Sequence, residues 1–199
     1  GYDGLFGAEM AHDPFLPLAL AAPVTSRIQL GTGIAVAFAR NPMTVAVTAH
    51  DLQQLSGGRF VLGLGAGWQE NEHARYGIPL GGVGERLDWF EEACAVWVSL
   101  RDEARTTFDG GRYQLDDAPL EPKPAGRLPL LIGASGQQRM ARIVARYADE
   151  WNTWSTPELW LEKRVGFDRA LDEAGRARDD LVRSTQALVF LGADGKRTA

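Results

Sequence analysis

The stretch from Ser56 to Glu70 (SGGRFVLGLGAGWQE) sets glycines at the end of a short apolar run, as a loop that cradles a phosphate would. A dinucleotide loop requires Gly-x-Gly-x-x-Gly before a helix, then a strand ending in an acidic residue about 20 positions on. Counted from Gly63 the third position holds Trp68, and counted from Gly65 it holds Glu70. The acidic strand end is also missing, and no Gly-Lys-Ser/Thr follows. The stretch therefore favours neither a Rossmann nor a Walker loop.

A second candidate is Gly133-Ala134-Ser135-Gly136-Gln137, which superficially resembles a nucleophile elbow. An elbow requires Gly-x-Ser-x-Gly, and Gly136 comes one residue too early. The segment instead predicts a strand, then small residues, then the start of a helix. Free backbone N–H groups near Ser135 and Gly136 could bind a phosphate there without a cationic side chain.

Alternating strand and helix patterns position these segments. Strands are predicted for residues 3–8, 27–36, 59–65, 130–134, 150–154 and 185–191, the first of them buried. Helices are predicted for residues 14–22, 42–55, 84–100, 137–148 and 157–174. Asn41 is expected to cap the second helix, and Gly57-Gly58 to end it. Residues 105–129 predict a small hairpin insertion and a proline-rich connector, within a single domain spanning residues 1–199.

The alternation predicts a mostly parallel α/β sheet covered by helices. Six such units fit either a doubly wound open sheet or a piece of an eight-stranded barrel. Small or polar residues follow several predicted strands, which in a barrel would gather on one rim. They are Gly33, Gly65 to Trp68, Ala134 to Gly136, and Asn152 to Trp154. For Gly65 and Gly67, close packing and an open rim beneath a flat ring are both open explanations.

Composition narrows the class of partner. The 199 residues are 45% hydrophobic and 24% charged, with a net charge of −5 and interspersed signs, which argues against nucleic acid. Cys94 is the one cysteine, and the three histidines are far apart, so no metal site is predicted. No apolar run approaches the ~20 residues that a membrane helix needs. We therefore expect a cytoplasmic protein with a small-molecule substrate, no membrane or nucleic-acid partner, and a homodimeric state.

The order of motifs resembles the luciferase-like monooxygenase superfamily, and most closely its oxidoreductases that use the deazaflavin coenzyme F420. The resemblance is carried across nearly the whole chain by DPFLPLALAAPVTSRIQLGTGIAVAF, LSGGRFVLGLGAGWQENEHARYG, ERLDWFEEACAVW, FDGGRYQL, PLLIGASG and ARYADEWNTW. It implies a TIM (β/α)8 barrel with the cofactor at the carboxyl-terminal rim. Since the chain begins at Gly1 without Met and has 199 residues against about 250 typical of the fold, it is interpreted as strands two to seven of eight.

The resemblance also assigns cofactor-binding residues. A non-prolyl cis peptide of the family, which backs the cofactor ring, falls on Gly33–Ile34. An asparagine that contacts F420 matches Asn71, and the second-strand acidic position matches Glu9. Two further strand ends that contact the cofactor, the first of them holding its phosphate, match Ser135 with Gly136 and Thr153 with Trp154.

This sequence departs from the family at the proton-transfer positions. Sugar-phosphate dehydrogenases of the family pair a histidine with a glutamate, where this chain has Met10 and Trp68. Neither side chain titrates, so that mechanism is in doubt. Met10 and Trp68 are instead placed in a substrate pocket, and Trp154 could line the pocket or pack as an ordinary aromatic. The catalytic residues are left unknown, with three nearby candidates that could equally be solvated: His12, Glu70 and His73.

The leading hypothesis is hydride transfer to or from a small organic substrate with F420. FMN-dependent monooxygenation uses the same scaffold and stays open as an alternative cofactor and reaction. A hypothesis of another class is a non-catalytic barrel fragment that self-associates through its open sheet edges.

Overall fold

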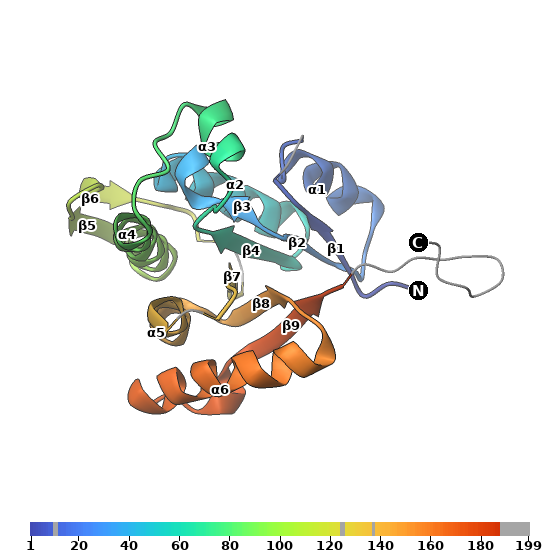
Figure 1. Cartoon of the computed structure of the whole chain (residues 1–199). Helices are drawn as coiled ribbons and strands as arrows, with labels where there is room; N and C mark the ends of the chain where they lie inside the picture. The colour runs from blue at the N-terminus through green and yellow to red at the C-terminus, as the bar shows by residue number, and fades with distance from the viewer. Residues whose placement is uncertain (10–11, 124–125, 137, 188–199) are drawn as a thin grey trace.

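A curved parallel sheet forms the centre of the protein (Figure 1). The computed structural model describes residues 1–9, 12–123, 126–136 and 138–187. Within them the strand order is β1-β2-β4-β7-β8-β9, with β3 also paired to β4. The spatial order follows the chain order without reversal, as in a barrel and unlike a doubly wound sheet. The strands are β1 (Gly4–Gly7), β2 (Gln29–Thr32), β3 (Ala35–Val36), β4 (Phe60–Gly65), β7 (Leu130–Gly133), β8 (Glu150–Trp154) and β9 (Val182–Gln186).

Helices surround the sheet, with α5 and α6 beneath β8 and β9 and α1 beside β1 (Figure 1). None of the helices in the described residues is long and apolar enough to cross a membrane. The helices are α1 (Leu16–Ala21), α2 (Pro42–Leu55), α3 (Glu70–Tyr76), α4 (Val83–Asp102), α5 (Gln138–Tyr147) and α6 (Pro157–Glu173), with short 3₁₀ turns η1 (Ala22–Val24), η2 (Ala37–Ala39) and η3 (Arg178–Asp180).

Helix α2 begins and ends where its sequence predicts. The Asn41 side chain accepts a hydrogen bond from the Met43 amide at 2.9 Å, which satisfies one of the free N–H groups of the first turn. At the other end Gly57 and Gly58 adopt left-handed backbone angles, φ 64° and 88°, which favour glycine. This confirms both predicted boundaries.

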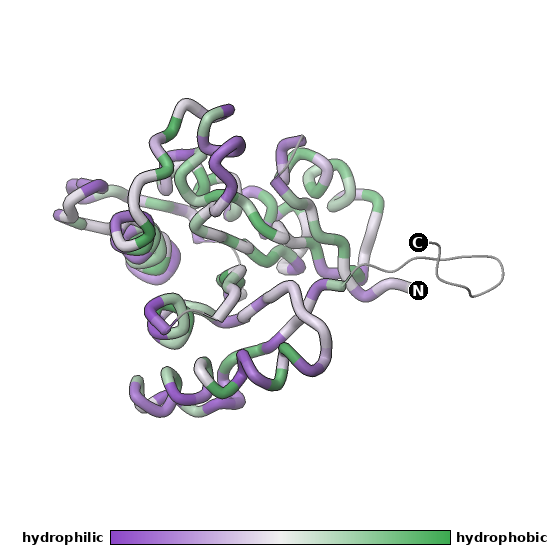
Figure 2. The backbone as a smooth tube through the Cα atoms, in the orientation of Figure 1, coloured by the Kyte–Doolittle hydropathy of each residue, from purple (hydrophilic) through white to green (hydrophobic). Residues whose placement is uncertain are grey.

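The core lies between the sheet and one face of each long helix. Strand β4 is buried along its whole length, and Figure 2 shows hydrophobic colouring along the central strands with polar segments outside. Trp151 of β8 stacks on Phe167 of α6, with ring centroids 3.7 Å apart. Each such side chain contributes about 1.5–3 kcal/mol by leaving water. The apolar stripe predicted for α4 is confirmed as buried, with Leu87, Phe90, Ala93, Cys94 and Trp97 all in the core.

The hairpin predicted around Gly110–Gly111 is present and forms its own two-stranded sheet. Strands β5 (Arg105–Asp109) and β6 (Gln114–Pro119) pair antiparallel with an irregularity after Thr106. Trp89 of α4 donates a hydrogen bond to the Tyr113 hydroxyl at 2.6 Å, which fixes the hairpin on that helix.

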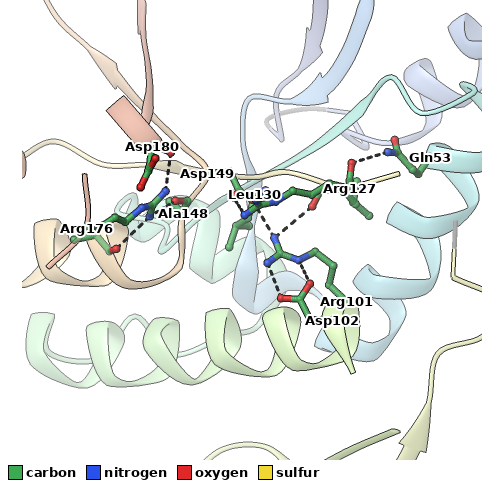
Figure 3. Close-up of polar contacts among 11 residues, drawn as sticks. Gln53, Arg101, Asp102, Arg127, Leu130, Ala148, Asp149, Arg176 and Asp180 are labelled. Carbon is green, nitrogen blue, oxygen red and sulfur yellow. Dashed lines mark hydrogen bonds and ion pairs between the residues drawn. The ribbon is translucent and has the colours of Figure 1, made fainter. Parts of the chain in front are cut away.

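A polar network joins the amino-terminal ends of the strands (Figure 3). The Asp149 carboxylate accepts hydrogen bonds from the Leu130 amide at 2.9 Å and from Arg101 at 3.0 Å, and pairs with Arg127. Arg176 donates to the Ala148 carbonyl at 2.6 Å, after the last residue of α5. These contacts stabilise the amino-terminal end of the sheet. The small residues that follow the strands lie at the opposite, carboxyl-terminal end.

Four predictions about elements need correction. The first strand is not buried: Leu5 and Phe6 are 43% and 41% exposed, because β1 has β2 as its one neighbour in the described sheet. The strand predicted over residues 27–36 is split into β2 and β3. Helix α3 was not predicted, since it has only seven residues and its N-cap makes no side-chain hydrogen bond. The last strand begins at Val182, three residues earlier than predicted, and residues 188–191 lie outside the described part.

Candidate functional site at the carboxyl ends of the strands

An irregular segment separates β2 from β3 at the rim. β2 pairs with β4 through Gly31 and Val61, while β3 pairs through Ala35 and Leu64, so one extra residue is accommodated between the two ladders. The Gly33–Ile34 peptide within it is cis, as the resemblance implies. The bulge therefore lies at the carboxyl end of the strand, where it interrupts the ladder.

The Ile34 side chain fills the centre of this rim because glycines face it on two strands. A Cβ built on Gly65 would lie 2.6 Å from Ile34 Cδ1, and one built on Gly133 would lie 3.0 Å from Ile34 Cγ2. Both distances are below ordinary van der Waals contact. Gly65 is thus needed for close packing of Ile34, which supports the first of the two explanations for this glycine. An open rim beneath a flat ring stays a prediction.

Glu9 holds the bulge from the end of β1. Its amide donates to the Ile34 carbonyl at 3.0 Å, and its carboxylate accepts the Val36 amide at 2.6 Å. The same carboxylate accepts Arg40 at 2.6 Å and the Tyr76 hydroxyl at 2.9 Å. Its side chain is 2% exposed. Burial and the bond to Glu9 raise the pKa of Tyr76. Glu9 therefore positions the backbone around Ile34, and both of its carboxylate oxygens already accept hydrogen bonds.

The far strand of the sheet reaches the same bulge. The Gln186 amide at the end of β9 lies 3.4 Å from the Gly33 carbonyl and can donate to it, although the two residues are 153 positions apart. This contact joins the ends of β2 and β9 across the curved sheet. The carboxyl ends of these two strands therefore lie at one rim, as the strand ends of a barrel do.

The ends of β7 and β8 are joined by a lysine from α6. The Lys163 ammonium donates to the Trp154 carbonyl at 2.8 Å and to the Thr153 hydroxyl at 3.2 Å. Its aliphatic stem covers Gly136, where an added Cβ would lie 3.3 Å from Lys163 Cγ. Lys163 thus contacts both pairs of residues to which the resemblance assigned the cofactor.

The donors at this place suit an anionic group. Gly136 has φ 107°, so a side chain there would be strained as well as crowded. Ala134 has both backbone groups satisfied, by the Asn152 carbonyl and by Trp151 Nε1. Ser135 is exposed, and among the described contacts neither its amide nor that of Gly136 donates a hydrogen bond. The Ser155 hydroxyl is buried and finds no partner among the described residues. Uncommitted donors and one cation fit a phosphate.

A surface hollow of about 500 Å³ lies where β4 leads into α3. It is lined by Trp68, Gln69, Glu70, Asn71 and Ala74, so three of the predicted site residues meet there. Trp68 is 78% exposed and is not a packed core aromatic. Trp154 is also largely exposed, at 59%. This hollow is formed by the segment that follows β4, and its lining includes no residue of β2, β7 or β8.

The other catalytic candidates are placed differently. His73 is 2% exposed, its ring nitrogens make no hydrogen bond in the described structure, and its Nε2 would lie 2.7 Å from a Cβ on Gly67. In this arrangement His73 packs against the Gly67 turn and is not among the residues that line the hollow, and a catalytic role for it stays a prediction. His12 is exposed and outside the hollow. Met10 lies outside the described residues.

Comparison with known proteins now identifies the chain. The family described as luciferase-like monooxygenase matches residues 1–197. The chain belongs to the luciferase-like monooxygenase family. Its sheet and helices are accordingly an incomplete α/β barrel of the luciferase-like type.

The relatives of this luciferase-like protein include enzymes named F420-dependent. It is 38% identical over its whole length to an uncharacterized protein of Mycobacterium tuberculosis, and 32% identical, over 92% of the chain, to the F420-dependent glucose-6-phosphate dehydrogenase of Intrasporangium calvum. Among solved structures, an F420-dependent secondary alcohol dehydrogenase in complex with an F420–acetone adduct superposes with a TM-score of 0.84 at 26% identity, over 93% of this chain and 60% of that one. The chain spans 61% and 59% of the lengths of the two sequence relatives.

Sequence reasoning missed several residues of this luciferase-like rim. Lys163 lies on α6, nine residues beyond Trp154, where the predicted strand-end motif ends, and carries no local motif of its own. Gln186 and Tyr76 reach the rim only through the fold. Glu72 was also missed; it lies beside His73 on α3, and burial raises the pKa of its carboxyl. The one available signal was the position of Lys163, on the helix that directly follows the Asn152 to Trp154 strand end.

Proposed function

We propose that this chain carries the cofactor-binding rim of an oxidoreductase that uses coenzyme F420 for hydride transfer to or from a small organic substrate. The observation that carries the proposal is the rim. At one end of the sheet it holds the Gly33–Ile34 bulge, packed against Gly65 and Gly133, and the ends of β7 and β8 that Lys163 contacts. The likeness to a dehydrogenase named F420-dependent supports the choice of cofactor. Because the chain spans about three fifths of its relatives, the activity proposed is that of the whole protein.

In this proposal the rim residues bind and orient the cofactor. Ile34 provides an apolar surface behind its ring, held by Glu9 and by Gln186 on the Gly33 carbonyl. Ser135, Gly136, Thr153 and Trp154 receive its phosphate end. Asn71 contacts it from the α3 hollow. A bound deazaflavin supplies the hydride donor or acceptor.

The substrate is proposed to enter at the hollow beside α3. The exposed indole of Trp68 would exclude water from one side of an organic substrate. Met10, which lies outside the described residues, stays a second predicted pocket residue. Of the three proton-transfer candidates, Glu70 is the one that lines this hollow, so we assign proton transfer with the substrate to its carboxylate. Glu70 lies in the first turn of α3 and is exposed, so its carboxylate would be accessible to a substrate in the hollow.

FMN-dependent monooxygenation is the alternative activity, supported by the family to which the chain belongs. The same rim would hold a flavin ring and its phosphate. The alternative of another class is self-association. In the described sheet β1 and β9 each have one unpaired edge, and Leu5, Phe6 and Val182 beside these edges are exposed.

Direct titration distinguishes these functions. The purified chain is titrated with F420 and with FMN, following quenching of ligand fluorescence, while light scattering reports the oligomeric state. The proposal expects saturable F420 binding tighter than FMN binding. Tighter FMN binding favours the monooxygenase alternative. Binding of neither ligand at tens of micromolar, together with stable oligomers, supports self-association and overturns the proposal.

A further inference from the structure

A half-buried lysine lies between two strand ends of the rim without a carboxylate partner. No aspartate or glutamate pairs with Lys163 among the described ion pairs. Two nearby arginines do have a carboxylate partner: Arg164 of α6 and Arg183 of β9 both pair with Asp168 of α6. The positive charge of Lys163 is therefore not neutralised by a carboxylate among the described residues.

The position of Lys163 is fixed by neutral groups. Its ammonium donates to the Trp154 carbonyl and the Thr153 hydroxyl, while the stem lies against Gly136. An ammonium has three N–H donors, so one remains for another acceptor. Thr153 is itself fixed, because its carbonyl accepts the Thr185 hydroxyl at 2.9 Å. The lysine is thus held in place with charge and donor capacity to spare.

We infer that Lys163 determines specificity for phosphate: it makes a cofactor that carries a phosphate bind more tightly than the same ring system without the phosphate. The spare N–H and the positive charge would pair with a phosphate oxygen beside Gly136, where a charge-assisted hydrogen bond gains more than a neutral one. The inference rests on the proposed function for the identity of the anion. It makes Lys163 a specificity-determining residue that neither the strand-end motif nor the relatives assign.

Paired ligands test this inference. FMN and riboflavin differ by one phosphate and are the matched pair. F420 and its phosphate-free deazaflavin nucleoside form a second pair, which differs also in the acidic tail beyond the phosphate. Lys163→Met keeps the stem over Gly136 and removes the ammonium, whereas Lys163→Arg keeps the charge. Arg142→Met removes one positive charge from the exposed pair with Glu173, away from the rim, and serves as the matched control.

The expected result is a loss of on the order of tenfold to a hundredfold in the affinity of Lys163→Met for the phosphate-bearing ligand. The phosphate-free ligand should bind all variants alike, Lys163→Arg should recover most of the loss, and Arg142→Met should match the wild type. Equal losses for both ligands, or no loss for either, would overturn the inference.

Inorganic phosphate separates this inference from the proposed function. If the wild-type chain binds neither flavin nor deazaflavin, the proposed function fails, and thermal unfolding with added phosphate still tests the lysine. A phosphate-induced rise in melting temperature that is absent in Lys163→Met would support the anion site. The same rise in both proteins would contradict it, as would no rise in either.

Discussion

Ile34 occupies the space that a side chain on Gly65 would need, since a Cβ there would lie 2.6 Å from Ile34 Cδ1. The glycine that resembled part of a phosphate loop therefore serves to admit a neighbouring strand's side chain to the rim. The relation explains why a glycine stands at this strand end although the stretch lacks the spacing of a nucleotide loop.

Gly65→Ala should destabilise the protein by about 1–3 kcal/mol, because the added methyl overpacks the rim. In an Ile34→Ala background the same change should cost less, since the nearest remaining Ile34 atom, Cβ, is 3.8 Å away. Urea unfolding of the four proteins measures this coupling. Gly166→Ala on α6, where a Cβ meets nothing within 4 Å, is the control and should be neutral or stabilising. Equal costs in both backgrounds would refute the packing relation.

Glu9→Gln should lower the free energy of unfolding by about 2–3 kcal/mol, because a buried carboxylate with three donors loses its charge opposite Arg40. Asp13→Asn is a matched comparison: it keeps the acceptor for the Phe15 and Leu16 amides and loses only the charge opposite Arg40, at an exposed position. Its cost should stay below about 1 kcal/mol. Similar costs for both variants would show that Glu9 does not hold the bulge.

His50 should make stability fall in mild acid. Burial lowers the pKa of its imidazole, with Lys123 adding to the effect, and neither ring nitrogen has a partner in the described structure. The unfolded chain then takes up a proton that the folded chain does not. This contribution is complete above the unfolded pKa of about 6.5 and is lost as pH falls toward the lower folded pKa.

His50→Phe tests this dependence by urea unfolding at pH 8 and pH 5.5. The variant should match the wild type at pH 8, because the ring shape is kept, and should lose less stability at pH 5.5. Asp51, Glu121 and Lys123 also act on His50, so the comparison is made at constant ionic strength. An unchanged acid decline would assign it to other groups.

Asp149→Asn should cost about 1–3 kcal/mol, since it weakens the bonds that join β7, α4 and the segment before β8 (Figure 3). Asp102→Asn removes a similar charge from an exposed partner of Arg101 and should cost less than about 1 kcal/mol. Chemical unfolding of both variants measures the difference. Neither change should affect cofactor affinity, because Asp149 lies at the opposite end of the sheet from the rim.

Local signals predicted most of the elements. The Asn41 cap, the Gly57-Gly58 stop and the apolar stripe of α4 act within a few residues, so their outcome could be read along the chain. The exposure of β1 and the division between β2 and β3 depend on which strand lies alongside, and α3 is too short to have a periodic pattern.

The candidate site was predictable only as separate strand ends. Sequence placed Ser135-Gly136 and Thr153-Trp154 after strands, but it could not show that Lys163 contacts both or that Gln186 reaches Gly33. The carboxylate of Glu9 was expected to bind cofactor, whereas its contacts show it holding Val36, Arg40 and Tyr76. Whether Glu9 also contacts the cofactor stays a prediction.

Hydrogen exchange with and without F420 tests most directly whether the carboxyl-terminal rim binds the cofactor. At saturating F420, amides in residues 32–36, 133–136 and 152–155 should exchange several-fold more slowly, while amides around Leu130 and Asp149 should be unchanged. Unaltered exchange along the rim, or protection confined to the Asp149 end of the sheet, would contradict the proposed function.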